Sequence, residues 1–134
     1  MLQETIETST IEVIEGSFAV IRLPVDVEIP FKAFGVTRDS TETTAIVRDN
    51  QLRDFKFLES HDGLRILRIN VSAPFMAPGF LAAVCTAVAS KGVNVLVLST
   101  FTRDYLLVSN EDLDPTLSAL RSIGFPIAPV GASL

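Results

Sequence analysis

Residues 78–99 predict a helix that leads directly into a strand, and this order constrains the fold more than any other part of the sequence. Proline suits the first helical position, as at Pro78, because its missing N–H would have no acceptor within the helix. Gly92 ends the helix, and the apolar run of residues 93–98 indicates a heavily covered strand. The helix presents one apolar face, made of Phe80, Leu81, Val84, Cys85 and Val88.

The start of this helix is suited to binding an anion. Free N–H groups of a first helical turn point outward and the helix dipole is positive there, so a carboxylate or phosphate is attracted by about 0.3–1 kcal/mol or more. Gly79 has no side chain, which lets a ligand approach the backbone closely. We therefore expect a small anionic ligand at this end of the helix.

Four further elements follow from the pattern of the second half. Residues 64–71 and 105–108 predict two more strands. A second helix is expected with Asp114 as its cap and Pro115 at its first position. Residues 125–130 predict the last strand.

The order of these elements is strand, helix, strand, strand, helix, strand, which predicts an α+β fold of the ferredoxin-like βαββαβ type. In this arrangement four antiparallel strands form one sheet, both helices cover one face, and the last strand lies at an edge beside the first. Pro126 and Pro129 agree with an edge position, because proline donates no hydrogen bond to a ladder.

The first half predicts a similar plan with less helix. Residues 11–14 and 18–23 are expected to form one hairpin, and residues 34–37 and 43–48 a second. Between Leu23 and Phe34 there is room only for the segment of residues 24–30 and about one helical turn. The first helix of this half is therefore expected to be short or absent.

The two halves align weakly but in register. A shift of 61 residues places residues 46–50 over residues 107–111. No flexible linker separates the halves, because residues 59–63 have the composition of a turn. We expect two domains, residues 1–62 and 63–134, that pack together.

The motifs of the second half resemble those of the ACT domain, a small regulatory module of amino-acid metabolism. They are Pro-Gly-Phe-Leu at residues 78–81, Gly-Val-Asn-Val at 92–95, and the strand that ends in Ser99. Residues 64–125 resemble one complete copy. The resemblance implies two tandem ACT-like copies, the first degenerate, as in small bacterial proteins related to the ACT pairs of aspartate kinases and of the cytosolic arginine sensor of animals.

The same resemblance implies which residues would meet a ligand. Gly79 and Phe80 match the segment that meets the ligand's carboxylate, and Asn94 matches an asparagine that hydrogen-bonds the ligand. An alternative for Asn94 is a bond to nearby backbone at the turn. The candidate ligand-binding residues are Phe75, Met76, Ala77, Gly79, Phe80, Asn94, Ser99 and Thr100.

One position departs from the family's pattern. Many members carry Asp or Asn two residues before the proline, whereas this chain has Met76. A cap and a polar ligand contact are therefore missing there. Phe75 and Met76 are expected to line an apolar side of the pocket or to pack between the domains.

Charge and composition exclude several classes of partner. The net charge of −5 resides in residues 1–60, and no basic stripe offers the attraction that nucleic-acid binding requires. No apolar run has the roughly 20 residues of a membrane helix, and residues 1–10 lack the order of a signal peptide. The chain is therefore expected to be soluble and cytoplasmic, with no nucleic-acid or membrane partner.

The residues give little support to an enzyme, a metal site or a cofactor. The single histidine, His61, lies in the turn between the halves, and Cys85 falls on an apolar helix face. A metal carrier of this fold would need a Cys-x-x-Cys pair where Pro74, Phe75 and Met76 stand. The candidates for an acyl-phosphate site are Arg38, Arg48 and Arg103, and the alternative for all three is a solvent-exposed hairpin charge.

Three hypotheses follow. The first is a non-catalytic regulatory module that binds a small molecule, an amino acid, and acts through a protein partner or its own oligomerisation, for example as a homodimer. The second is a structural dimerisation or interaction module with a vestigial pocket. The third is a small hydrolase of the acyl-phosphate type.

Overall fold

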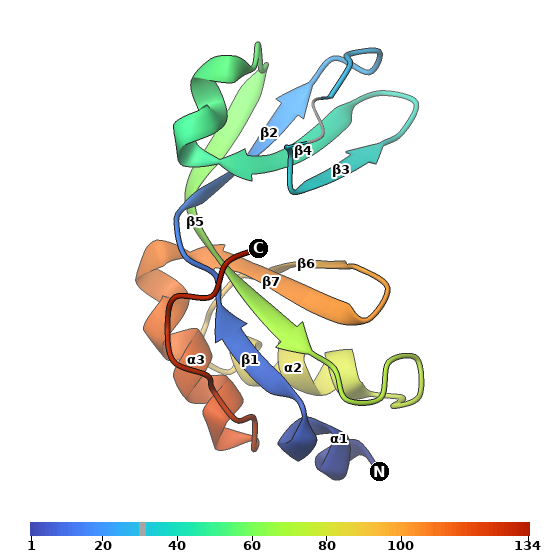
Figure 1. The fold of residues 1–134 in the computed structure, drawn as a ribbon, viewed down its shortest axis with the longest axis vertical. Helices are drawn as coiled ribbons and strands as arrows, with labels where there is room; N and C mark the ends of the chain where they lie inside the picture. Colours follow the sequence, from blue (N-terminus) through green and yellow to red (C-terminus); the bar gives the residue numbers. More distant parts are fainter. Residues whose placement is uncertain (30–31) are drawn as a thin grey trace. The chain divides into compact units, whose positions relative to one another are not determined.

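The computed structural model describes residues 1–29 and 32–134, and these form two compact units. Unit 1 consists of residues 1–15 and 65–134, and unit 2 of residues 16–64. The fold is α+β, with antiparallel strands and α-helices (Figure 1). The class predicted from the sequence is therefore confirmed.

The sheet of unit 1 has the strand order β1-β5-β7-β6. The strands are β1 (Thr10–Val13), β5 (Glu59–Asn70), β7 (Arg103–Ser109) and β6 (Leu96–Ser99). β1 pairs antiparallel with β5, and β6 antiparallel with β7. β6 therefore forms one edge, and β5 is shared because its first residues belong to unit 2.

The helices of unit 1 are α1 (Leu2–Thr8), α2 (Phe80–Ala89) and α3 (Leu113–Ser122). α2 and α3 contact each other and lie behind the strands in Figure 1. Both were predicted from the sequence, whereas α1 was not. The core between helices and sheet contains Ile11, Leu67, Ile69, Val84, Val88, Leu106, Val108 and Leu120.

The start of α3 differs from the prediction. The 3-10 helix η2 (Asn110–Asp112) runs directly into α3, so Asp112 is the cap residue instead of Asp114. Pro115 then stands third instead of first in the helix. This position is still in the first turn, where an N–H would have no acceptor within the helix, so proline causes no loss there.

The predicted hairpin of residues 11–14 and 18–23 is wrong. β1 instead pairs with the end of β5, where Ile11 lies opposite Ile69. β2 (Phe18–Leu23) pairs with strands of unit 2. The physical reason is burial, because β1 places Ile11 and Val13 in the interior of unit 1.

The expected place of the last strand beside the first is also wrong, because β1 occupies it. Residues 125–130 contribute a single parallel bridge, Ile127 to Ile11, and Ala132 adds another to Ile14. The backbone N–H of Ile11 donates to the carbonyl of Pro126 at 3.0 Å. Since the prolines donate nothing, the contact does not extend into a regular ladder.

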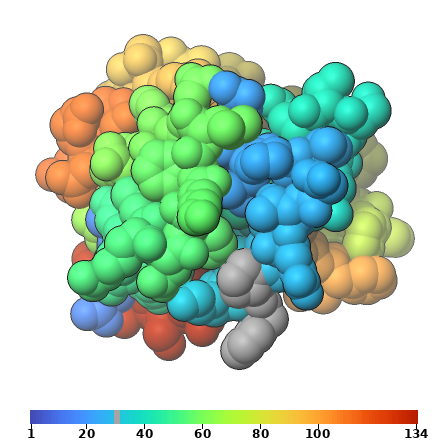
Figure 2. All heavy atoms as spheres, turned by 90° about the horizontal axis from the view of Figure 1, so that it is seen from above, coloured from blue at the N-terminus to red at the C-terminus, as the bar shows by residue number. Residues whose placement is uncertain are grey.

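Unit 2 is a sheet with the strand order β3-β4-β2-β5. β3 (Gly35–Arg38) and β4 (Thr43–Arg48) form the predicted hairpin, which is confirmed. The 3-10 helix η1 (Asp49–Asp54) contacts β2 and β4. In Figure 2 the bright green atoms around the start of β5 lie beside the blue atoms of β2, with which β5 pairs. Residues 24–29 contain no helix, and Pro30 of the predicted short segment lies outside the described residues.

The division of the chain into two compact units differs from the predicted domain boundary in one respect. The sequence places residues 1–15 with the first domain, whereas they are part of unit 1 together with residues 65–134. As a division into two ACT-like domains, residues 1–62 and 63–134 stay a prediction.

Candidate functional site

A cavity of about 410 Å³ lies in unit 1 where α2 begins. Three segments enclose it, namely the connection from β5 to α2, the first turn of α2, and the turn between β6 and β7. This volume falls in the range of small-molecule sites. The lining residues are Val71, Ala73, Pro74, Phe75, Ala77, Pro78, Gly79, Phe80, Leu81, Ala82, Ser99, Thr100, Phe101, Thr102, Arg103 and Asp104.

Six of the eight candidate ligand-binding residues line this cavity, namely Phe75, Ala77, Gly79, Phe80, Ser99 and Thr100. Met76 and Asn94 do not line it, and both are exposed. Asn94 precedes β6, whose opposite end at Ser99 reaches the cavity. Five extended residues span about 16 Å, so Asn94 lies well away from the cavity.

The backbone at the start of α2 leaves donors at the cavity. Gly79 is the cap residue in the left-handed conformation, with φ of +86°, and its carbonyl accepts the N–H of Ala83 at 2.9 Å. The N–H of Phe80 already donates to Ala77 at 3.1 Å. Leu81 and Ala82 have no acceptor within the helix for their N–H groups, and both residues line the cavity.

Replacing Gly79 by alanine is expected to destabilise the protein by about 1–2 kcal/mol, because an L side chain is strained in the left-handed region. The added Cβ would meet Leu2 Cδ2 at 3.6 Å, an ordinary contact, so the loss comes from the backbone. Urea unfolding measures it. Gly79→Asn is the matched variant, since asparagine tolerates this conformation better. Equal losses in the two variants would contradict this explanation.

Two aromatic side chains meet at the rim of the cavity. The rings of Phe75 and Phe101 are 5.0 Å apart at their centroids in a T-shaped arrangement, although the residues are 77% and 82% exposed. Phe75 has φ of +66°, a conformation that costs a bulky residue on the order of 1–3 kcal/mol. Phe101 is not among the residues predicted for the site, although a phenylalanine inside a polar link was an available signal.

The polar side chains of the cavity are held by hydrogen bonds. Ser99 Oγ donates to Asp104 Oδ1 at 2.6 Å, and Arg103 Nε donates to Asn70 Oδ1 at 2.7 Å. Arg103 was predicted only as a candidate for an acyl-phosphate site, and Asp104 is not among the predicted residues. Arg103 and Asp104 lie at the same cavity as Gly79 because of the path of the β6–β7 turn. The local sequence pattern does not predict that path.

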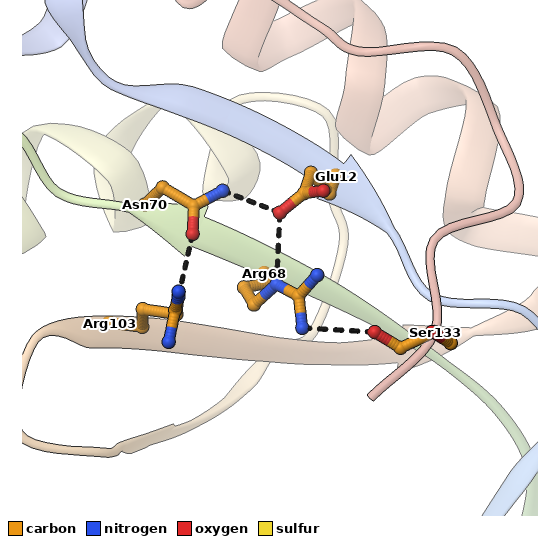
Figure 3. A network of polar contacts seen from close by, with 5 residues as sticks. All are labelled: Glu12, Arg68, Asn70, Arg103 and Ser133. Atoms are coloured by element: carbon orange, nitrogen blue, oxygen red, sulfur yellow. Dashed lines mark hydrogen bonds and ion pairs between the residues drawn. The ribbon is translucent and has the colours of Figure 1, made fainter.

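Arg103 belongs to a network that joins β1, β5, β7 and the C-terminal segment (Figure 3). Glu12 accepts hydrogen bonds from Arg68 Nε at 2.9 Å and from Asn70 Nδ2 at 2.5 Å. Arg68 also donates to the carbonyl of Ser133 at 3.1 Å. The bond from Arg68, followed by that from Asn70, lowers the pKa of Glu12 below its ordinary value.

Other side chains that could bind a metal ion or take part in catalysis lie apart from one another. Among residues 1–29 and 32–134, no three His, Cys, Asp or Glu side chains are grouped so as to hold a metal ion. His61 is exposed on β5, and Cys85 is half-buried on α2. In the same described residues, no helix is long and apolar enough to cross a membrane.

Comparison with known proteins identifies the domain that carries the cavity. Residues 59–122 match the family model of the ACT domain. This segment is similar to an ACT domain. This stretch includes β5, α2, β6, β7 and α3, and the match confirms the resemblance found in residues 64–125. ACT domains are typically non-catalytic regulatory modules.

The fold also resembles solved structures along most of its length. Protein Atu0741 from Agobacterium tumefaciens is similar at 23% identity over 92% of this chain and 94% of its own, with a TM-score of 0.79. VC0802 from Vibrio cholerae, described as a protein of unknown function and possible transport protein, is similar at 17% identity over 92% and 95%, with a TM-score of 0.76.

The fold also resembles that of a protein described as regulatory. The regulatory subunit of aspartate kinase from Thermus thermophilus is similar at 13% identity over 88% of this chain and 97% of its own, with a TM-score of 0.65. At such identities the likeness shows the fold alone. No curated protein matches the sequence.

Proposed function

We propose that the chain is a non-catalytic regulatory module that binds an amino acid in the cavity at the start of α2. The observation that carries this proposal is the convergence of six predicted ligand residues on one cavity of an ACT domain. The free N–H groups of Leu81 and Ala82 would take the ligand's carboxylate. Met76 and Asn94, which do not line the cavity, stay predictions as ligand residues.

The proposal includes two ACT-like copies, residues 1–62 and 63–134, with the first copy degenerate. The 61-residue shift supports it, because it pairs Arg48 with Ser109. Each residue ends a strand and precedes a 3-10 helix, with φ and ψ of −68° and 146° at Arg48 and −60° and 149° at Ser109. The likeness to an aspartate kinase regulatory subunit over 88% of the chain agrees with this arrangement.

The module would act through a protein partner or through its own oligomerisation. The aspartate kinase subunit that it resembles is itself described as regulatory. We expect this module to work in the cytoplasm, where amino acids are metabolised.

A second candidate function, a structural dimerisation module, has two observations in its favour. α2 carries no charged side chain from Phe80 to Ala89, and its Leu81 is exposed. β6 is an edge strand with unpaired backbone groups, and its Leu96 is also exposed. A dimer that forms without any ligand effect would favour this function.

Two of the three arginines proposed for the acyl-phosphate hydrolase give it no support. Arg38 donates to the hydroxyl of Thr43 and the carbonyl of Val27 within unit 2. Arg103 is held by Asn70 in unit 1. These bonds give both side chains a structural role.

The test is a thermal-shift screen against the twenty amino acids, followed by size-exclusion chromatography with each amino acid that raises the Tm. A ligand at a hundredfold excess over its Kd adds about 2.7 kcal/mol, which raises the Tm of a chain of this size by several degrees. Ala82→Glu places a competing carboxylate at the cavity and should abolish the shift.

The matched control is Ala89→Glu, which adds the same charge at the far, exposed end of α2. It should keep the full shift. If no amino acid raises the Tm of the unmodified protein, the proposed function is wrong. If Ala82→Glu responds as the unmodified protein does, the ligand binds elsewhere.

A further inference from the structure

The walls of the cavity are mainly apolar. Phe80 closes its inner side and is buried, and its ring contacts Phe125 at 5.6 Å between centroids. Pro74 and Leu81 add apolar surface, and the pair of Phe75 and Phe101 forms the rim. Apolar walls of this kind favour a ligand that brings apolar surface of its own.

The charged lining residues of the cavity are one arginine and one aspartate, Arg103 and Asp104. Each is fixed by a polar neighbour, Arg103 by Asn70 and Asp104 by Ser99. The lining charges therefore cancel. An amino acid with an uncharged side chain also carries one charge of each sign, whereas a charged side chain would bring a third charge with no lining partner.

Phe75 adds evidence that the rim has a function. A phenylalanine at φ of +66° is retained only where its surroundings compensate for the strain, and such residues cluster at ligand sites. Its ring contacts that of Phe101, and both side chains are otherwise largely exposed. The strained backbone thus keeps an aromatic side chain at the mouth of the cavity.

We propose that the ligand is a neutral amino acid with an apolar side chain, which lies against the Phe75–Phe101 pair. This inference rests on the proposed function and names its ligand class. Lysine, arginine, aspartate and glutamate bind more weakly, because their side-chain charge loses water without gaining a partner. Polar neutral side chains are disfavoured for the same reason to a smaller degree.

Titration calorimetry with matched pairs of free amino acids tests the ligand class. The pairs are valine with threonine, leucine with asparagine, and norleucine with lysine. The first two pairs differ in polarity at nearly constant shape, and lysine carries the norleucine side chain extended by a terminal ammonium group. We expect the apolar member of each pair to bind about 10- to 100-fold more tightly, as an apolar pocket discriminates against polar isosteres.

The aromatic rim is tested by substitution in the full chain. Phe101→Ser should remove most of the preference within each pair, and Phe101→Leu should keep much of it, because leucine restores the apolar contact. The matched control is Phe57→Ser, which alters a partly exposed phenylalanine in unit 2 and should leave the preference unchanged. Circular dichroism verifies that each variant is folded.

The outcomes separate this inference from the proposed function. If none of the six amino acids, nor any of the remaining natural ones, binds the folded protein, the proposed function itself fails. If lysine, asparagine or threonine binds at least as tightly as its apolar counterpart, the inferred ligand class is wrong and the proposed function stands. An unchanged preference in Phe101→Ser would overturn the role of the aromatic rim.

Discussion

Replacing Leu106 by alanine is expected to lower the free energy of unfolding by about 2–5 kcal/mol. Leu106 lies on β7 and is fully buried in the core of unit 1, in the same cluster as Val84 of α2 and Leu120 of α3. Truncation removes apolar contacts and leaves a cavity that the surrounding helices and sheet fill only in part. Urea unfolding followed by far-UV circular dichroism measures the change.

Leu96→Ala is the matched control for this substitution. Leu96 lies on the neighbouring strand β6, opposite Leu107 of β7, and is 46% exposed. The same chemical change there should cost less than about half as much, because fewer contacts are lost. Comparable losses at Leu106 and Leu96 would contradict the assignment of the core.

Glu12→Ala is expected to destabilise the protein by about 1–3 kcal/mol, because it removes the acceptor of two hydrogen bonds. Arg68 would lose its carboxylate partner while its side chain remains only 15% exposed. Asn70 would lose the contact that orients it toward Arg103. Since Arg103 lines the cavity, ligand affinity should fall as well.

The acid dependence of stability checks the same network. The pKa of Glu12 is lowered in the folded protein, so its contribution is fully present above the ordinary value of 4.5. The contribution is lost as the pH falls through the lower, folded-state pKa. Glu12→Gln should lose less stability between pH 5 and pH 3 than the unmodified protein, whereas Glu4→Gln, on exposed surface, should follow the unmodified protein.

Elements encoded by local pattern could be predicted from the sequence. The Pro-Gly start, the apolar face and Gly92 suffice to predict α2. The candidate residues next to its start in the sequence line the cavity because the cavity lies at the start of this helix. Phe101 and Asp104 were not selected because their role depends on the β6–β7 turn folding back toward α2. Short-range periodicity does not specify that approach.

Long-range pairing could not be predicted. β1 alternates buried and half-buried residues as any hairpin strand does, and nothing local distinguishes Phe18 from Ile69 as its neighbour. α1 spans seven residues and carries two buried ones, too few for a periodic signal. Glu12 and Arg68 meet only because β1 and β5 pair. The local sequence pattern therefore could not predict the hydrogen-bond network that includes Arg103.

The sharing of β5 between the two units has a consequence for biosynthesis. Residues 16–64 are translated between the two segments of unit 1, so the ribosome releases β1 long before Leu67 and Ile69 exist to pair with it. Contacts of such sequence separation form slowly. All residues of unit 2 are synthesised before unit 1 is complete. During this time β1 has no partner strand, and the side chains of Ile11 and Val13 are exposed to solvent. A fragment limited to residues 59–122 would never receive β1, and it should aggregate during expression.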